Sequence, residues 1–405
     1  MKILQVNSFY YNRGGDSTCM FQTTDLLRSH GHDVVHFSMQ HPQNFPNKYS
    51  SYWPSYIDYR EAIKDKSLKN FTKVINRTIY SVEAKKCISN FLDDVRPDIV
   101  HIHNILHHIT PSILSEIKKR GIPIVWTLHD YTVICPNTSL LTDQGEVCEA
   151  CKPTKFYMAP IKRCKKNSLG ASLIAMFENY THRLLSLYRH VDVFIAPSDF
   201  LRRKFIEYGI GARVIVLNNF IDTEKLKYNS IDKGYYLYVG RIHHSKGIDV
   251  LIEAAKACAD IPLKIVGDGD ILDNFRAMNL PDNIEFTGFK QGDELITLIA
   301  GAMFTVVPSQ LYENFPYSVL ESMAMGKAVI GANMGGIPEQ IEHGVNGYLF
   351  NHKDVSALSD YIKQLADIPE LRAAMGREAR TRVEKLYSSS VHYEKLMNIY
   401  ENTLQ

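Results

Sequence analysis

The sequence predicts an α/β protein built from two doubly wound, Rossmann-like domains in series. Two observations lead to this prediction. The chain has 405 residues, which is more than a single hydrophobic core usually occupies. Short apolar runs of strand length alternate with helical patterns along it, as is typical of parallel sheets with helices on both faces. Two such domains facing each other form a cleft at the carboxyl ends of their strands, where ligands bind.

The first half of the chain contains six apolar runs of strand length, with a helical pattern at 17–30 between the first two. The predicted strands are 2–6, 33–39, 98–104, 122–130, 191–198 and 213–219. The segment 220–233 is polar and rich in turn residues, so we expect it to join the two domains. We therefore place an N-terminal domain at 1–222 and a C-terminal domain at 223–386.

The second half repeats the alternation more tightly. Its predicted strands are 234–241, 263–267, 283–289, 304–308, 327–332 and 348–350, and its predicted helices include 246–258, 292–302 and 316–325. From residue 354 onward the pattern is almost wholly helical, and the last helix is expected at about 389–404.

Composition and charge exclude several classes of protein. The chain has 46 basic and 44 acidic residues, and a net charge of +2 gives no support for nucleic-acid binding. No segment approaches the roughly 18 apolar residues of a membrane span, and the first apolar run is too short for a signal peptide. We therefore expect a cytoplasmic protein, at most peripheral on the inner face of the membrane. Its seven cysteines are not expected to form a disulfide framework.

The stretch at 304–326 is the most informative part of the sequence. An apolar run predicts a buried strand, a loop follows, and Pro316 is suited to begin a helix because the first helical position needs no N–H donor. Glu313 lies just before this helix and Glu321 lies inside it. Backbone N–H groups at the helix N-terminus favour an anion and carboxylates favour hydroxyl groups, so a sugar diphosphate would satisfy both. The alternative is two solvated surface glutamates.

Two further segments carry groups suited to phosphate. Gly14 and Gly15 lie between the first strand and the first helix, where glycine lets the backbone approach a phosphate closely. A plain strand-to-helix turn is the alternative. Arg241 and Lys246 follow a strand and precede a helix, where two cations are unfavourable without an anion. They predict a bound diphosphate, with a solvated basic loop as the alternative.

His129 lies at the end of the predicted strand 122–130, at the edge of the expected cleft. A histidine at this place can hydrogen-bond a ligand or take part in proton transfer. The alternative is a purely structural histidine.

Four of the cysteines are spaced C-x12-C-x2-C-x12-C along the chain. They are Cys135, Cys148, Cys151 and Cys164. Four thiolates around a central C-x2-C suit a tetrahedral zinc ion, and four protein ligands leave no open position, so such a zinc would be structural. The alternative is four unrelated cysteines.

Basic and aromatic residues are mixed in the segments 60–86 and 155–168. This mixture is typical of a solvated helix face and a flexible loop. The alternative is contact with anionic lipid or with a polyprenyl-diphosphate-linked acceptor.

Together these segments resemble the retaining, nucleotide-sugar-dependent glycosyltransferases of family 4, which have the GT-B fold. The resemblance covers nearly the whole chain, and its most specific motif is the E-x7-E formed by Glu313 and Glu321. The other motifs are the glycine pair at 14–15, TLHDY at 127–131, APS at 196–198, NNFID at 218–222, VGRIHHSKGID at 239–249, VGDG at 266–269 and FTGF at 286–289.

The resemblance implies catalytic roles for four residues. Arg241 and Lys246 would neutralise the diphosphate that leaves with the nucleotide, which would stabilise the transition state without a catalytic metal or other cofactor. Glu313 would bind hydroxyl groups of the donor sugar, and His129 would contact that sugar near the reacting centre. Glu321 would bind the ribose hydroxyl groups.

The resemblance also implies the rest of the donor site and one feature of the fold. The remaining donor-binding residues would be Gly14, Gly15, Thr287, Gly288, Phe289, Asn314, Phe315 and Pro316. Of these, Thr287 to Phe289 would lie near the nucleobase. The last helix, 387–405, would pack back on the N-terminal domain.

The implied function is transfer of a sugar from a UDP- or GDP-linked donor to a glycan or lipid-linked acceptor during surface polysaccharide synthesis. The alternatives are a nucleotide-sugar epimerase and a non-catalytic nucleotide-sugar-binding protein. The family often has glycine where this chain has Asn314 and Pro316, which leaves the donor preference open. The choice between front-face attack and a covalent intermediate is also left open.

Overall fold

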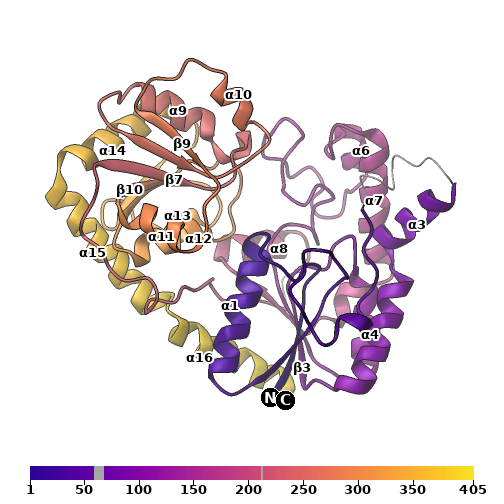
Figure 1. Ribbon diagram of the computed structural model, residues 1–405. Helices are drawn as coiled ribbons and strands as arrows, with labels where there is room; N and C mark the ends of the chain where they lie inside the picture. The colour runs from indigo at the N-terminus through magenta and orange to yellow at the C-terminus, as the bar shows by residue number, and fades with distance from the viewer. Residues whose placement is uncertain (59–67, 211–212) are drawn as a thin grey trace.

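The chain folds into two lobes, each containing one parallel sheet of six strands (Figure 1). The computed structural model describes residues 1–58, 68–210 and 213–405. Part of the predicted basic and aromatic segment 60–86 therefore lies outside the described residues. Helices cover both faces of each sheet, so the predicted fold class of two doubly wound α/β units is confirmed.

The first sheet has the strand order β2-β1-β3-β4-β5-β6. Its strands are β1 (Lys2–Val6), β2 (Asp33–Phe37), β3 (Ile99–Ile102), β4 (Ile124–Thr127), β5 (Val193–Ala196) and β6 (Val214–Val216). The strand order reverses between β1 and β3, where Ile3 pairs with Ile99. At such a switch point the loops that leave the two strands diverge to opposite faces, and this leaves a crevice for a ligand.

Alternating residues of the first sheet enter two cores, because successive side chains of a strand point to opposite faces. Leu4 and Val6 pack on one face and Ile3 packs on the other. The helices of this lobe are α1 (Gly15–Ser29), η1 (Ser50–Tyr52), α3 (Leu68–Ile79), α4 (Val82–Val95), η2 (Pro111–Ile113), α5 (Leu114–Lys119), α6 (Met158–Lys162), α7 (Leu169–Leu184), η3 (Leu187–His190) and α8 (Asp199–Glu207).

The second sheet has the strand order β12-β11-β10-β7-β8-β9 and its own switch point between β7 and β10. Its strands are β7 (Tyr235–Val239), β8 (Leu263–Val266), β9 (Ile284–Gly288), β10 (Ala302–Val307), β11 (Ala328–Ala332) and β12 (Gly347–Phe350). Its helices are η5 (His244–Lys246), α9 (Ile248–Lys256), α10 (Leu272–Arg276), α11 (Gly292–Ala300), α12 (Tyr317–Ala324), α13 (Ile337–Gln340), α14 (Val355–Asp367) and α15 (Pro369–Leu386).

The last helix, α16 (Ser389–Leu404), returns to the first lobe (Figure 1). Leu396 and Tyr400 are fully buried in one cluster with Ile3 of β1, and the Tyr400 hydroxyl lies 2.6 Å from Nδ1 of His101. The chain therefore passes between the lobes twice, once between β6 and β7 and once between α15 and α16. The domain limits 1–222 and 223–386 stay a prediction from the sequence.

Local signals explain where several helices begin. The Ser81 hydroxyl accepts a hydrogen bond from the Ala84 N–H and caps α4, and Ser198 caps α8 in the same way. Pro316 lies one position earlier than we expected, at the N-cap of α12, with a φ of −65° that fits the start of a helix. None of the helices in the described part of the chain is long and apolar enough to cross a bilayer.

Candidate active site

A cavity of about 790 Å³ lies between the two lobes. Its walls come from the loops that follow β1, β3 and β4 in the first lobe and β7 and β10 in the second. Both switch points therefore open into the same space, and this is where doubly wound sheets bind ligands. The structure brings ten predicted site residues to this cavity, namely Gly14, Gly15, His129, Arg241, Lys246, Glu313, Asn314, Phe315, Pro316 and Glu321.

Three predicted donor-binding residues do not line the cavity. Thr287, Gly288 and Phe289 lie at the end of β9, which is the edge strand of the second sheet. The Thr287 hydroxyl donates to the Ile265 carbonyl at 3.3 Å, and the Phe289 side chain is 66% exposed. The assignment of these three residues to a nucleobase site stays a prediction.

Lys246 and Glu313 form an ion pair in the cavity. The Lys246 ammonium lies 2.6 Å from Oε1 of Glu313, and the Ser309 hydroxyl donates to the same oxygen at 2.5 Å. We had expected the charge of Lys246 to require a bound anion, but Glu313 balances it. Oε1 is thus engaged twice, while Oε2 makes no hydrogen bond with the described residues and is available to a ligand hydroxyl.

Two glycines bring the loops that carry this ion pair together. Gly247 has a φ of +73°, and a Cβ added there would lie 1.9 Å from the Pro308 carbonyl oxygen. The loop after β7 therefore packs directly on the end of β10. Gly335 packs against the backbone of the Glu313 loop, because a Cβ added at Gly335 would lie 2.2 Å from the Glu313 carbonyl oxygen. The Gly336 N–H donates a hydrogen bond to the same oxygen at 2.6 Å. Gly335 and Gly336 were not predicted from the sequence as part of the site.

Glu321 lies in α12 and lines the cavity without a cation partner in the described chain. Burial raises its pKa from 4.5 to about 7, because a desolvated carboxylate is less stable than the neutral acid. The two glutamates of the motif therefore differ in electrostatic environment. Glu313 faces a lysine. Glu321 has no charged partner among the described residues, and its carboxyl group can hydrogen-bond the hydroxyl groups of a ligand.

His129 is joined to a line of polar groups within the first sheet. Its Nε2 lies 3.0 Å from Nδ1 of His103, and Nε2 of His103 lies 3.1 Å from Oε1 of Gln5. Burial lowers the pKa of His129 to about 4, so the ring is neutral near pH 7. Its Nδ1 makes no hydrogen bond within the described residues and is the nitrogen left for a ligand.

Asn314 links the two lobes beside this histidine. Its Nδ2 donates to the backbone carbonyl of His129 at 2.6 Å, while its Oδ1 is buried and has no partner among the described residues. A buried polar atom without a partner is costly. Oδ1 is therefore a position at which a ligand donor would be favourable.

The glycine pair at the start of α1 leaves open space. A Cβ added at Gly15 would meet no atom within 4 Å, and one at Gly14 would meet only a carboxylate oxygen of Asp16 at 3.7 Å. The protein itself does not require glycine at these positions. A ligand approaching the free N–H groups of α1 would give the glycines a role.

Several cavity residues were not predicted. They include Asp16, Asn104, Ser309, Tyr312 and Tyr317. Asn219 lies in the NNFID motif that supported the resemblance but received no role there, and its Nδ2 donates to the Phe315 carbonyl at 2.9 Å. The position of a residue directly after a strand, as for Asn104 and Ser309, is the signal that could have identified them.

Outside the cavity, a carboxylate of the second lobe caps a helix of the first. Glu339 in α13 accepts the Asp199 N–H at 2.8 Å and the Phe200 N–H at 2.7 Å, both in the first turn of α8. The positive end of the helix dipole favours this carboxylate. Nothing in the local sequence pairs Glu339 with α8, because the two segments are 139 or more residues apart.

The four cysteines of the array are free thiols in the loop between β4 and α7. The thiols of Cys135, Cys148 and Cys164 all raise the pKa of Cys151, which burial has already raised, so the four lie in one neighbourhood. No three of them come within 4.8 Å in the described structure. Their chemistry fits zinc, and zinc binding would require this loop to contract around the ion. Glu149, between two of the cysteines, accepts the Tyr312 hydroxyl at 3.3 Å and so connects the loop to the second lobe.

The described part of the two basic and aromatic segments lies away from the cavity. In the second segment, Tyr157 is 48% exposed and Ile161 in α6 is 67% exposed. Neither residue lines the cleft. The choice between a solvated surface and a lipid contact stays open for this segment.

Two family descriptions match the chain. Glycosyltransferase Family 4 matches residues 13–225, and Glycosyl transferases group 1 matches residues 221–382. The two matches meet at the first passage between the lobes.

Similar proteins carry related names. An uncharacterized glycosyltransferase of Methanocaldococcus jannaschii is 33% identical over 50% of this chain, which spans 56% of that protein. An uncharacterized 42.6 kDa protein in the cps region of Klebsiella pneumoniae is 25% identical over 84% of this chain and 87% of its own. The N-acetyl-alpha-D-glucosaminyl L-malate synthase of Bacillus anthracis is 26% identical over 97% of this chain and 94% of its own.

Solved structures share the fold across the whole chain. Sucrose-phosphate synthase of Thermosynechococcus elongatus aligns with a TM-score of 0.70 and 18% identity over 99% of this chain and 98% of its own. Anabaena HepE in complex with UDP-glucose aligns with a TM-score of 0.67 and 16% identity over 99% of this chain and 100% of its own. At these identities the likeness concerns the fold alone.

Proposed function

The chain belongs to glycosyltransferase family 4, whose members use nucleotide sugars, and from that membership we propose a more specific reaction. The protein transfers a sugar, with retention of anomeric configuration, from a UDP- or GDP-linked donor to a hydroxyl group of a glycan or lipid-linked acceptor. The product is a surface polysaccharide or its precursor.

One observation supports this proposal more than any other. A single cavity brings Arg241 and Lys246 of the second lobe together with Glu313 and Glu321, and the start of α1 with its glycine pair lines the same space from the other lobe. Arg13, Asp16 and Asp130 of the first lobe also line it. A sugar diphosphate has the matching chemistry, because its phosphates take the cations and N–H groups while its sugar and ribose hydroxyl groups take the carboxylates.

Five cavity residues have specific roles in the proposed reaction. Arg241 and Lys246 stabilise the negative charge that develops on the leaving diphosphate. Glu313 orients the donor sugar through the oxygen that Lys246 does not engage, and Glu321 accepts from the ribose. Neutral His129 accepts a hydrogen bond from the sugar at Nδ1.

The acceptor side of the proposal rests on the first lobe and on relatives. Thr138 and Ser139, from the loop between β4 and α7, line the cavity opposite the donor loop. The Klebsiella relative is named for the cps region, and the Anabaena structure holds UDP-glucose. These names favour a surface glycan acceptor and a uridine nucleotide.

The test combines donor binding with turnover. Calorimetry with UDP-glucose, UDP-N-acetylglucosamine and GDP-mannose identifies the donor, and release of nucleoside diphosphate is then followed with and without a glycan acceptor. We expect release to require the acceptor, and proton NMR of the product to show the anomeric configuration of the donor. Conversion of the donor to an epimer without an acceptor would support the epimerase alternative instead. Inertness of the folded protein across donors and acceptors would count against both.

A further inference from the structure

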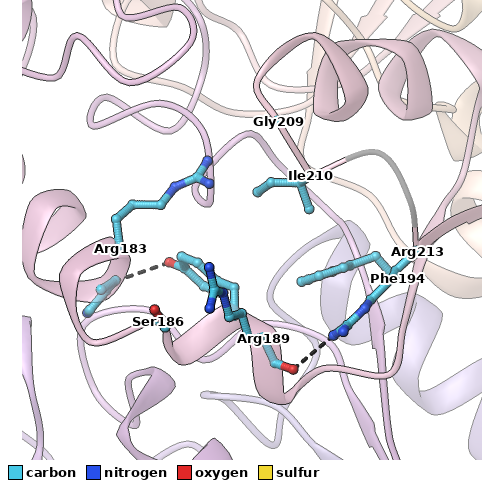
Figure 2. A pocket seen from close by; sticks show the side chains of 9 residues that line it. Arg183, Ser186, Arg189, Phe194, Gly209, Ile210 and Arg213 are labelled. Carbon is cyan, nitrogen blue, oxygen red and sulfur yellow. Dashed lines mark hydrogen bonds between the residues drawn. The ribbon is translucent and has the colours of Figure 1, made fainter.

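A second cavity lies on the first lobe, where α7 ends and η3 and β5 follow. Its volume is about 310 Å³, and Figure 2 shows the side chains that line it. None of its lining residues lines the cleft between the lobes. It is therefore a separate site, with a volume at the lower end of the range for small-ligand pockets.

Three arginines surround this cavity. Arg183, Arg189 and Arg213 are arranged around one opening in Figure 2. Within the described chain, none of the three forms an ion pair with a carboxylate. Three positive charges around one small cavity repel one another and concentrate a positive potential there.

Structural roles account for only some of the arginine N–H groups. Nη2 of Arg183 donates to the Tyr208 carbonyl at 3.2 Å, and Nη1 of Arg213 donates to the carbonyls of Arg189 and Val191 at 2.8 and 2.9 Å. These hydrogen bonds satisfy backbone carbonyl groups at the C-terminal ends of α8 and η3. They use one nitrogen of each of the two arginines and no nitrogen of the Arg189 side chain.

Other donor groups of the three arginines and of Ser186 have no hydrogen-bond acceptor among the described residues. Nε of Arg183 is buried and has no hydrogen-bond partner among the described residues, which is unfavourable for a charged group. Burial also lowers the pKa of Arg183. The Ser186 hydroxyl lines the cavity and makes no hydrogen bond with the described residues. An anion in the cavity would supply an acceptor for donor groups that line it.

We propose that this arginine pocket binds a phosphoryl group at a site separate from the donor cleft. The guanidinium fork matches phosphate oxygens in geometry, and several charge-assisted hydrogen bonds can form at once. Leu184 and Leu185 directly follow Arg183 and are 85% and 49% exposed. These exposed apolar side chains suit a phosphate group that is carried by an amphiphile such as a lipid. Free phosphate would present the same oxygen atoms to the arginines.

The first experiment measures inorganic phosphate binding by calorimetry in the full chain. Arg13→Gln, Arg241→Gln and Lys246→Gln together remove the arginine and lysine side chains that line the cleft, so the remaining phosphate binding reports on the arginine pocket. Adding Arg183→Gln and Arg189→Gln should weaken this binding about 10-fold or more. Arg377→Gln, an exposed arginine of α15, is the matched control and should leave it unchanged. Loss of all phosphate binding on removal of the cleft cations, or no response to the pocket variants, would overturn the proposal.

Arg189→Gln alone guards against misfolding, because this side chain is exposed and bonds no described residue. It should weaken phosphate binding while leaving the thermal unfolding midpoint unchanged.

The second experiment separates the two sources of phosphate. Sedimentation with phosphatidylcholine vesicles that contain phosphatidic acid should show binding if the ligand is a lipid headgroup. Both Arg183→Gln with Arg189→Gln and Leu184→Gln with Leu185→Gln should then reduce it. Free phosphate is the ligand if the arginine variants weaken inorganic phosphate binding and wild-type protein does not sediment with the vesicles. Vesicle binding that persists unchanged in the arginine variants would overturn the assignment to a lipid headgroup.

Discussion

The two glutamates of the E-x7-E motif lie in one cavity but differ in their partners. Glu313 shares one oxygen with Lys246 and Ser309, and its other oxygen remains available. Glu321 has no cation partner among the described residues, and burial raises its pKa to about 7. The spacing of the motif thus places one carboxylate in a loop beside a lysine and the other inside a helix, where burial favours its neutral form.

The cavity cations should be essential for turnover. We expect Arg241→Ala or Lys246→Ala to lower kcat/KM on the order of 100-fold, as loss of a group that stabilises developing negative charge does. Lys246→Arg should retain part of the activity, because it keeps a cation beside Glu313. Lys256→Ala, at an exposed position of α9, is the control and should be near normal. Near-normal rates in both alanine variants would remove these residues from the mechanism.

The buried Glu321 carboxyl should lower the free energy of unfolding as the pH rises. Its folded pKa of about 7 exceeds the ordinary value of 4.5, so the folded state binds more protons than the unfolded state between these pH values. Stability from this group therefore falls from pH 4.5 to about 7, by on the order of 3 kcal/mol. Relative to wild type, Glu321→Gln should gain stability across this window in urea unfolding, and under the proposed function it should weaken donor binding. Glu378→Gln, at an exposed position of α15, should give no such trend.

At the scale of elements, the order of strands and helices followed from the sequence. The hydrophobic periodicity and the turn residues predicted every strand of both sheets to within a few residues. Pro316 and Gly326 predicted the limits of α12. The pairing of Lys246 with Glu313 could not be predicted, because the two residues are 67 positions apart and meet only through the β7–β10 switch point. The contacts of His129 with His103 and of Glu339 with α8 could not be predicted for the same reason, because they also join residues that are distant in sequence.

The distance between Thr287–Phe289 and the cavity also depends on strand order. The family resemblance, and not the sequence periodicity, implied that these three residues belong to the donor site. Only the order β10-β7-β8-β9 shows that β9 is two strands away from the switch point. Sequence periodicity carries no information about that order, since parallel strands can be placed in several arrangements with the same pattern.

We propose that the cysteine loop binds one structural zinc ion. Protein purified without a histidine tag should contain about one zinc per chain by elemental analysis. Cys148→Ser with Cys151→Ser should remove the metal and lower the unfolding midpoint, since metal binding contributes to folding. Cys258→Ser, which alters a cysteine outside the array, should retain the zinc. Metal-free protein with an unchanged midpoint in the double variant would exclude the site.

The last helix should stabilise the first lobe. Leu396 is fully buried against β1 and its neighbours, so Leu396→Ala should lower the free energy of unfolding by about 2–5 kcal/mol. Leu404→Ala, at a position that is 41% exposed in the same helix, should have little effect. Urea unfolding followed by Trp fluorescence measures this, because Trp53 and Trp126 both belong to the core of the first lobe. Equal stability of the two variants would contradict the packing.

For the whole molecule, buried histidines should dominate the response to acid. Burial lowers the pKa of six histidines most strongly, to about 3 or 4 for five of them and well below 6.5 for His103. The other five are His36, His101, His108, His129 and His392. The unfolded state binds protons at these positions below pH 6.5 while the folded state does not, so stability falls as the pH drops from 6.5 toward 4.

We expect this acid effect to exceed the opposite contribution of the carboxyl groups whose pKa burial raises, which are Asp130, Glu321 and Glu339, because the six strongly shifted histidines outnumber them. The thermal unfolding midpoint should therefore fall steeply between pH 6.5 and 4. His36→Gln should flatten this dependence, and His352→Gln, at an exposed position, should leave it unchanged. A midpoint that is constant or rises over this range would show that the histidines are not buried as described.

The two passages of the chain between the lobes lie side by side. The Ile221 N–H donates to the Tyr387 carbonyl at 3.0 Å, and Ile221 also pairs with Ser388. Two connections that are hydrogen-bonded to each other restrict the relative orientation of the lobes more than one flexible connection would. They therefore help to hold Asn314 of the second lobe against the His129 carbonyl of the first, where the two halves of the site meet.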